Sequence, residues 1–81
     1  MDISKTAEYQ AHLKTSEKRC GKGTFAYGNQ SVQTFPESLI KEAAQDVYNR
    51  LSGHGLSYGA IVLILDIVQS YLRFRSDSQP L

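Results

Sequence analysis

The amino-acid sequence predicts a small α+β domain: an N-terminal helix, a β-hairpin, and an antiparallel αα-hairpin whose last helix is very apolar. Apolar residues recur at helical spacing through residues 36–51 and again through 57–74. Before them, glycines interrupt a stretch of Thr, Phe, Tyr and Val, which are residue types that favour strands. The length of 81 residues allows a single domain. Its predicted segments are a weakly ordered or helical stretch (1–22), the β-hairpin (23–35), the helical core (36–75) and a flexible tail (76–81).

The first helix is expected over residues 1–19, with Asp2 or Ser4 as its cap. Its apolar stripe is thin because Ala7 and Ala11 are two of its members. Such a helix gains little from packing. We therefore expect it to add little to the core, and to be frayed, short or ordered only by a partner.

The hairpin is expected to pair residues 23–27 with residues 30–34 through a Gly28-Asn29 turn. Strand-forming side chains on both sides of that turn favour this pairing. A two-stranded hairpin is marginal on its own. We therefore expect it to lie on the helices or to extend the sheet of another chain.

The run Thr34-Phe35-Pro36-Glu37 predicts the start of the next helix. Thr34 is placed to act as the N-cap, Pro36 suits the first turn, and Glu37 completes a capping box. The helix is expected over residues 36–51, where apolar side chains fill an arc of about 180°. Gly53 is the expected stop signal.

The last helix is expected over residues 57–74, with Ser57 as its cap. Its apolar side chains span an arc of roughly 200°, about twice the width that one neighbour covers. It therefore needs at least two neighbours, and we predict that it is the central element of the fold. The connection over residues 52–56 is short, which predicts that the two helices run antiparallel.

This wide apolar face is large for so short a chain. Burying one Leu or Ile is worth about 1.5–3 kcal/mol, so leaving two or three in water would cost much of the stability. A symmetric dimer would cover them. The residues expected to mediate self-association are Ile61, Leu65, Val68 and Leu72. In the alternative, the first helix closes a monomeric core together with Phe25, Tyr27, Val32 and Phe35.

No constellation of residues predicts catalysis, so we expect neither an enzyme nor a cofactor or metal site. The run Gly21-Lys22-Gly23-Thr24 lacks the first glycine and the following helix of a phosphate loop, and a turn is expected there. Cys20 lies among cations that favour the thiolate, but no histidine lies near it in the sequence to act as a base. His12, His54 and this one cysteine do not have the spacing of metal ligands.

The charges are nearly balanced, with a formal net charge of +1. Nucleic-acid binding requires a clustered basic face, and only the patch Lys18–Lys22 is locally basic. A helix-turn-helix is disfavoured because the first turns of the last helix, Tyr58–Leu63, are hydrophobic. Glu42 and Asp46 lie at i, i+4 and predict a solvated acidic strip that would attract a basic partner.

Three features indicate the compartment. One cysteine excludes an internal disulfide and suits a reducing environment. The N-terminus is polar and lacks the pattern of a signal peptide. The longest apolar run, Ala60–Leu65, is far too short to span a bilayer. We therefore expect a cytoplasmic protein without a membrane partner.

These exclusions favour a small protein-interaction module, a regulator or inhibitor that binds a partner protein and forms a homodimer. Tyr and Arg are enriched at interfaces, and basic and aromatic side chains supply the expected contacts. The expected partner-binding residues are Lys18, Arg19, Lys22, Phe25, Tyr27, Tyr48 and Arg73. One alternative is a nucleic-acid-binding accessory protein that uses residues 14–22 and the hairpin aromatics. Another is a small-ligand-binding protein with a pocket between the hairpin and the helices.

Overall fold

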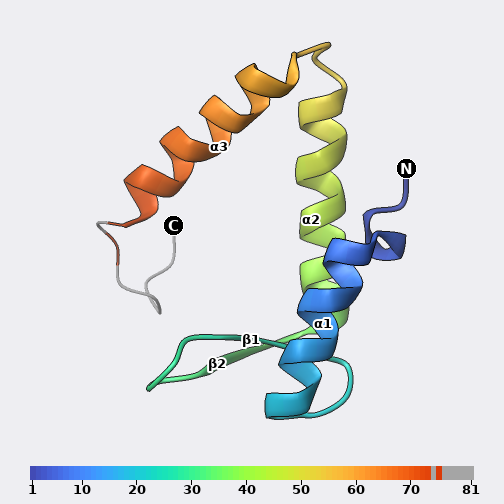
Figure 1. The fold of residues 1–81 in the computed structure, drawn as a ribbon, viewed down its shortest axis with the longest axis vertical. Coiled ribbons are helices and arrows are strands. Elements are labelled where there is room, and N and C mark those ends of the chain that lie inside the picture. The colour runs from blue at the N-terminus through green and yellow to red at the C-terminus, as the bar shows by residue number, and fades with distance from the viewer. Residues whose placement is uncertain (74, 76–81) are drawn as a thin grey trace. The chain divides into compact units, whose positions relative to one another are not determined.

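The computed structural model describes residues 1–73 and residue 75; the predicted tail over 76–81 lies outside the described residues. The elements are the 3₁₀ helix η1 (Ile3–Lys5), α1 (Ala7–Cys20), β1 (Thr24–Tyr27), β2 (Gln33–Pro36), α2 (Glu37–Ser52) and α3 (Tyr58–Leu72). Figure 1 shows this order along the chain. A helix, an antiparallel hairpin and two further helices confirm the predicted α+β class. The chain forms two compact units, Met1–Asn49 and Arg50–Leu81.

Two caps, rather than one, start the N-terminal helical segment. The Asp2 carboxylate accepts hydrogen bonds from the backbone N–H and the hydroxyl of Ser4 and caps η1. These hydrogen bonds lower the pKa of Asp2. The Thr6 hydroxyl then accepts from the backbone N–H of Tyr9 at 3.2 Å and caps α1. The segment is therefore a short 3₁₀ helix followed by a well-capped α-helix.

The first unit has its core on α1. Tyr9 and Leu13 are 7% and 8% exposed, and they are the buried hydrophobic residues of the described chain. The Tyr9 ring meets Phe25 of β1 edge to face, with ring centroids 5.3 Å apart. Ser16 lies three residues after Leu13 on the same face and is also buried. The expectation that this segment adds little to the core is therefore wrong, because two large side chains at i, i+4 compensate for the alanines.

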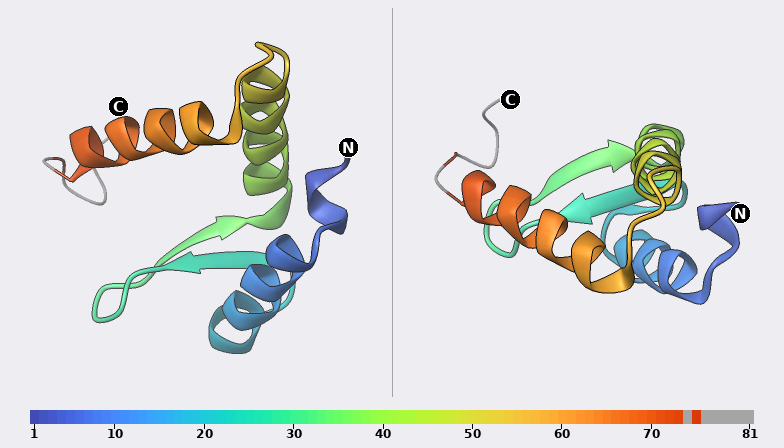
Figure 2. Two further views of the ribbon diagram at one scale, coloured as in Figure 1. Left: turned by 45° about the horizontal axis from the view of Figure 1, so that its top comes forward. Right: turned by 90° about the horizontal axis from the view of Figure 1, so that it is seen from above.

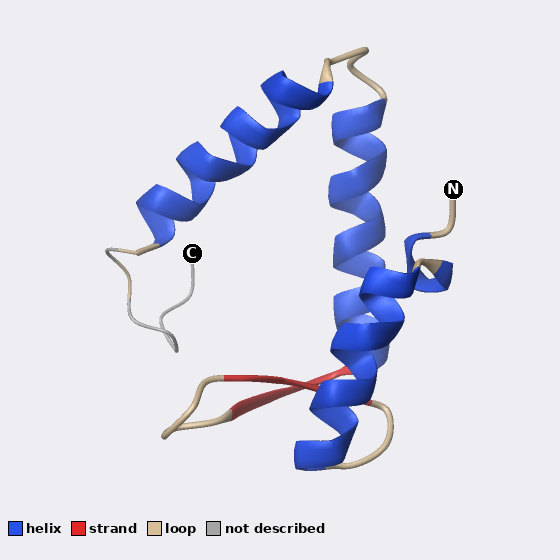
Figure 3. Ribbon diagram, viewed as in Figure 1, coloured by secondary structure: helices blue, strands red, loops and turns tan. Residues whose placement is uncertain are grey.

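The hairpin is real, but its second strand begins later than predicted. Strands β1 and β2 pair antiparallel, with Phe25 opposite Phe35 and Tyr27 opposite Gln33. Figure 3 shows these two strands in red. A five-residue connection replaces the predicted two-residue turn, and the Arg19 guanidinium donates a hydrogen bond to the carbonyl of Gly28 at its start, at 2.7 Å. This hydrogen bond ties the end of α1 to the start of the loop.

The predicted capping box at the start of α2 is wrong. Thr34 and Pro36 belong to β2, and the Glu37 backbone N–H donates to the carbonyl of Gly23 at 2.9 Å. Along an antiparallel ladder, hydrogen-bonded residue pairs alternate with pairs that exchange no hydrogen bond. The bond from Glu37 to Gly23 flanks the Thr24–Pro36 pair, which is therefore of the second kind and needs no N–H from residue 36. Proline is therefore tolerated there, and the sheet takes the place of a side-chain cap. Figure 2 shows β2 running directly into α2.

The last helix starts as predicted, but it contributes no buried residue. The Ser57 hydroxyl accepts from the backbone N–H of Ala60 at 3.3 Å and caps α3. No residue of α3 is buried. The expectation that this helix is the central element is not met in the structure, where the buried apolar side chains of the described residues lie on α1.

Candidate functional site

Helix α3 carries the largest collection of exposed apolar side chains in the described chain. Its exposed members are Tyr58, Val62, Leu63, Leu65, Ile67, Val68, Tyr71 and Leu72. Asp66 is the only charged residue between Tyr58 and Leu72. A helix that is apolar around most of its circumference is normally buried among neighbours. This helix is therefore the leading candidate for an interaction surface.

Eight apolar residues of α3 form two stripes, and Tyr58, Val62 and Leu63 lie off both of them. Ile61, Leu65, Val68 and Leu72, which we call the aliphatic stripe, follow one another at intervals of four, three and four residues. Ala60, Ile64, Ile67 and Tyr71, which we call the mixed stripe, have the same intervals. At 100° per residue, the centres of the two stripes lie about 100° apart. Each interval pattern is that of a heptad seam, so each stripe can pack along one neighbouring helix.

The two stripes differ in chemistry. The aliphatic stripe has no polar atom in its side chains. In the mixed stripe, the Tyr71 hydroxyl accepts a hydrogen bond from Nη1 of Arg75 at 3.2 Å, and Ala60 offers little apolar area. The aliphatic stripe is therefore the better dry seam, whereas the mixed stripe suits a surface with polar groups at its edge.

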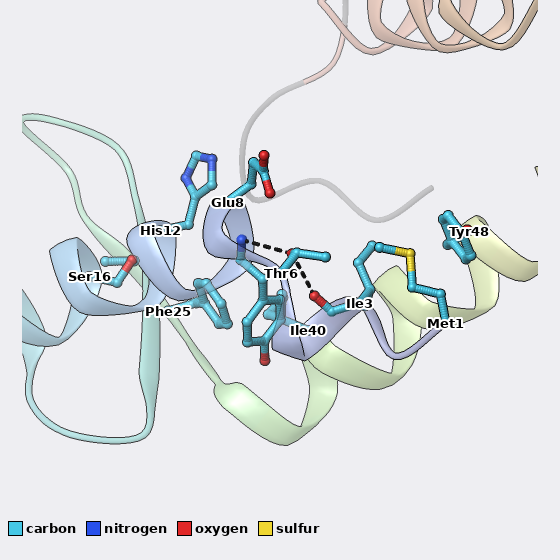
Figure 4. A pocket seen from close by; sticks show the side chains of 11 residues that line it. Met1, Ile3, Thr6, Glu8, His12, Ser16, Phe25, Ile40 and Tyr48 are labelled. Atoms are coloured by element: carbon cyan, nitrogen blue, oxygen red, sulfur yellow. Dashed lines mark hydrogen bonds between the residues drawn. The ribbon is translucent and has the colours of Figure 1, made fainter. Parts of the chain in front are cut away.

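The first unit contains an apolar groove of about 560 Å³, shown in Figure 4. Phe25 and Ile40 line its middle, and Met1, Ile3 and Tyr48 line the end toward the N-terminus. Tyr9 is a further lining residue. Glu8, His12 and Ser16 are polar lining residues on α1. The groove corresponds to the pocket expected between the hairpin and the helices.

Two polar side chains that line this groove, Tyr9 and Thr6, already have partners within the chain. The Tyr9 hydroxyl donates to Oε2 of Glu37 at 2.7 Å. Burial raises the pKa of Tyr9 to about 12, assisted by this hydrogen bond and by the negative charge of Glu37. The Thr6 hydroxyl donates to the carbonyl of Ile3 while it caps α1. The groove therefore presents mainly apolar surface to a ligand, with few free groups to orient it.

The predicted partner-binding residues come from several elements, and six of the seven lie in the first unit. Lys18 and Lys22 are exposed near the end of α1, while Arg19 is used to hold the hairpin loop. Phe25 is half-buried against Tyr9 and acts in packing.

The other three predicted partner-binding residues lie on or beside three further elements. Tyr27 is 60% exposed at the end of β1. Tyr48 lines the groove. Arg73 is exposed after the last turn of α3, in the second unit. A joint role for all seven residues stays a prediction.

The glycine-rich turn, Cys20 and His54 lie in a loop, at the end of a helix and in a connection. Gly21 and Gly23 have φ values of 103° and 75° and lead into a strand, as expected for the predicted turn. Cys20 is a half-exposed free thiol. His54 is exposed in the connection before α3. No group of three His, Cys, Asp or Glu side chains within the described residues is arranged to hold a metal ion.

The Gln45 side chain makes long-range contacts that the sequence did not predict. The Gln45 side chain accepts from the backbone N–H of Ile3 and donates to the carbonyl of Met1, both at 2.8 Å. It also donates to Oδ1 of Asn49 at 2.9 Å. A surface glutamine carries no sequence signal for such a role, because its partners are more than forty residues away.

Within the described residues, no helix has the length and apolar character needed to cross a membrane.

The chain was compared with protein families, curated proteins and solved structures. No protein family, curated protein or solved structure matches the chain.

Proposed function

We propose that the chain is a non-enzymatic protein-interaction module, a regulator or inhibitor that acts by binding a partner protein through α3. The observation that supports this proposal is the exposure of the apolar side chains on both stripes of that helix. Ile67 and Val68, on different stripes, are 61% and 50% exposed. Exposed apolar patches of this kind mark sites of protein–protein interaction.

Covering the apolar side chains of α3 would contribute to the free energy of binding a partner. Complete burial of one Leu, Ile or Val side chain is worth about 1.5–3 kcal/mol, so a half-exposed one gains about 1 kcal/mol when it is covered. Several such side chains on one stripe offset a substantial part of the cost of association, which is about 4–15 kcal/mol. A helix of similar apolar character on the partner, or an apolar groove, would supply the surface.

Two observations weigh against nucleic acid as the partner. The net charge is +1, and Arg19, one of the cations of the 14–22 segment, already binds a backbone carbonyl. Phosphate binding depends on several cations that displace counterions together. A mobility shift with DNA or RNA that weakens as salt rises would favour this alternative instead.

The location that suits this function is the cytoplasm. A single free cysteine is compatible with a reducing compartment, where disulfides are rare. There the module would meet folded partners directly.

The test is affinity capture of the tagged full chain from its source cell, followed by quantitative mass spectrometry. The variant Ile67→Gln places a polar group on the mixed stripe with a residue that favours helices. Its matched control is Ser70→Gln, an exposed position off both stripes of the same helix. We expect one partner to be enriched with the wild type and the control, and lost with Ile67→Gln while the circular dichroism spectrum is unchanged. Recovery of the bait alone, or equal capture by both variants, would overturn the proposal.

A further inference from the structure

We infer that the apolar groove of the first unit binds a small amphipathic amine, with the ammonium group beside Glu8 and a hydrogen-bonding group beside Ser16. This is a binding activity beyond the proposed function, because every residue that lines the groove lies within Met1–Asn49, whereas the proposed partner surface is α3. The inference defines the ligand by its chemistry: a flat apolar body with one positive charge and one polar group.

The groove has the size and the lining of a site for a small molecule. Its volume of about 560 Å³ lies within the range of about 300–1,000 Å³ that is usual for ligand pockets. Phe25 and Tyr48 supply aromatic surface, while Ile3 and Ile40 supply aliphatic surface. A ligand with a flat apolar body therefore gains free energy by leaving water for this groove.

The hydroxyl of Ser16 is a polar group that the protein leaves for a ligand. Ser16 is 7% exposed, and no described residue forms a hydrogen bond with its side chain. No fully buried side-chain oxygen or nitrogen of the described residues lacks a partner, so the Ser16 oxygen keeps some access to solvent. Ser16 lines this groove and a second groove beside it, which supply that access. A hydroxyl or carbonyl group of a ligand would complete the missing hydrogen bond.

The charges around the groove favour a cation. Glu8 lines the groove, is exposed, and forms no ion pair with any described residue. Among the described residues, no lysine or arginine side chain lines it. Burial raises the pKa of Tyr9, another lining residue, and the negative charges of Glu37 and Asp2 raise it further. The field at the groove is therefore negative, which attracts an ammonium group and repels a carboxylate.

The positions of Glu8 and Ser16 set the length of the ligand. The two residues lie eight positions apart on α1, which is about 12 Å along the helix axis. His12 lies between them and also lines the groove. Figure 4 shows Ser16 at the end of the groove away from Met1 and Tyr48. A body of two joined aromatic rings therefore suits the distance between the two polar groups better than a single ring.

Titration calorimetry of the full chain at pH 7 with three related biphenyls tests the inference. The first carries an aminomethyl group at one end and a hydroxyl group at the other. The second lacks the hydroxyl group, and the third has an uncharged hydroxymethyl group in place of the aminomethyl group. We expect the first compound to bind about fivefold more tightly than either of the others, because each of them loses one polar contact.

Three variants assign these differences to the groove. Glu8→Gln keeps the size of the side chain and removes its charge, so the first and third compounds should bind equally. Ser16→Ala removes the hydroxyl, so the first and second compounds should bind equally. The matched control is Glu42→Gln, which removes the same charge from an exposed residue of α2 that does not line the groove, and it should retain both preferences. An unchanged circular dichroism spectrum checks the fold of each variant.

Several outcomes would overturn the inference. They are a wild type that binds none of the three compounds, a preference for the uncharged compound, and a Glu8→Gln variant that keeps the preference of the wild type. Nuclear magnetic resonance gives the location: the amides of Ser16 and Phe25 should shift when the first compound binds. Shifts confined to α3 would show adsorption to its exposed apolar side chains and would also overturn the inference.

The tests separate this inference from the proposed function. A chain that binds the first compound in the groove but captures no partner protein would support the ligand site and overturn the proposed function. A chain that captures a partner through Ile67 but binds none of the biphenyls would have the opposite meaning.

Discussion

Replacing Tyr9 with Phe removes the hydroxyl that joins α1 to the first residue of α2. That hydroxyl donates to Oε2 of Glu37 at 2.7 Å, and the ring itself is 7% exposed and packs against Phe25. The substitution keeps the ring and its edge-to-face contact. Any loss of stability therefore reports on the hydrogen bond.

The magnitude follows from the charge and exposure of the acceptor. A hydrogen bond to a charged group contributes about 1.5–3 kcal/mol. Glu37 is half-buried and can recover part of its hydration, so the low end applies, about 1.5 kcal/mol. For a domain of this size each kcal/mol shifts the midpoint of thermal unfolding by about 4–8 °C, so Tyr9→Phe is expected to unfold about 6–12 °C lower.

Thermal unfolding of the full chain, followed by far-ultraviolet circular dichroism at pH 7, measures this shift. The control is Tyr27→Phe, which removes the same hydroxyl from a side chain that is 60% exposed. Its midpoint is expected to stay at the wild-type value. Equal midpoints for the two variants would refute the reasoning.

The pH dependence gives the same interaction a second readout. Burial, with help from Glu37, raises the pKa of Tyr9 to about 12 in the folded chain, against 10.0 for an unperturbed tyrosine. A raised pKa favours the protonated form, so its contribution to stability is complete below pH 10 and is lost as the pH rises toward 12. The difference in stability between the wild type and Tyr9→Phe should therefore shrink from pH 10 to pH 12. A constant difference over that range would contradict this.

Three further substitutions test the first unit. Leu13→Ala removes a buried side chain of the small core and is expected to destabilise the chain by about 2–4 kcal/mol in urea unfolding. Gln45→Ala removes the hydrogen bond from the backbone N–H of Ile3, and that amide should exchange with deuterium faster than it does in the wild type. Gly28→Ala adds a Cβ that would collide with the carbonyl oxygen of Ser31 at a φ of 107°, so hairpin amides should lose protection.

Each of these has an outcome that contradicts it. Gly23 also has a positive φ, but an added Cβ would meet no atom within 4 Å, so Gly23→Ala should cost less than Gly28→Ala. The reverse order would refute the collision. Unchanged exchange at Ile3 in Gln45→Ala would show that the N-terminal turn is held by other contacts. A loss of stability in Leu13→Ala below that of an exposed position such as Val47→Ala would show that α1 does not carry the core.

Features that depend on neighbours along the chain were predictable. Apolar spacing located α2 and α3 to within two residues at their described ends. The Ser57 cap was predictable because its hydrogen bond reaches only three residues ahead. The hairpin was predictable from its glycines and strand-forming residues. The turn over Gly21 and Gly23 was predictable because this glycine-containing run does not have the spacing of a phosphate loop.

The start of α2 shows where local signals mislead. Thr34, Pro36 and Glu37 satisfy the pattern of a capping box, but the same backbone can pair with β1. The bond from the Glu37 N–H to the Gly23 carbonyl then satisfies the donor that a cap would have served. A side-chain cap and strand pairing therefore compete for the same backbone N–H. The sequence pattern indicates the cap, and the structure has the strand pairing.

The candidate site likewise has features that the sequence determined and features that only the tertiary structure decided. By itself, the sequence determined the stripes of α3, because helical periodicity alone places Leu65 and Val68 on one face. Only the tertiary structure decided that Arg19 serves the hairpin loop, that Phe25 packs on Tyr9, and that α1 rather than the last helix holds the buried side chains. The physical reason is distance along the chain: periodicity and caps act within a turn or two, whereas burial and hydrogen bonding depend on which distant segment supplies the other half of the contact.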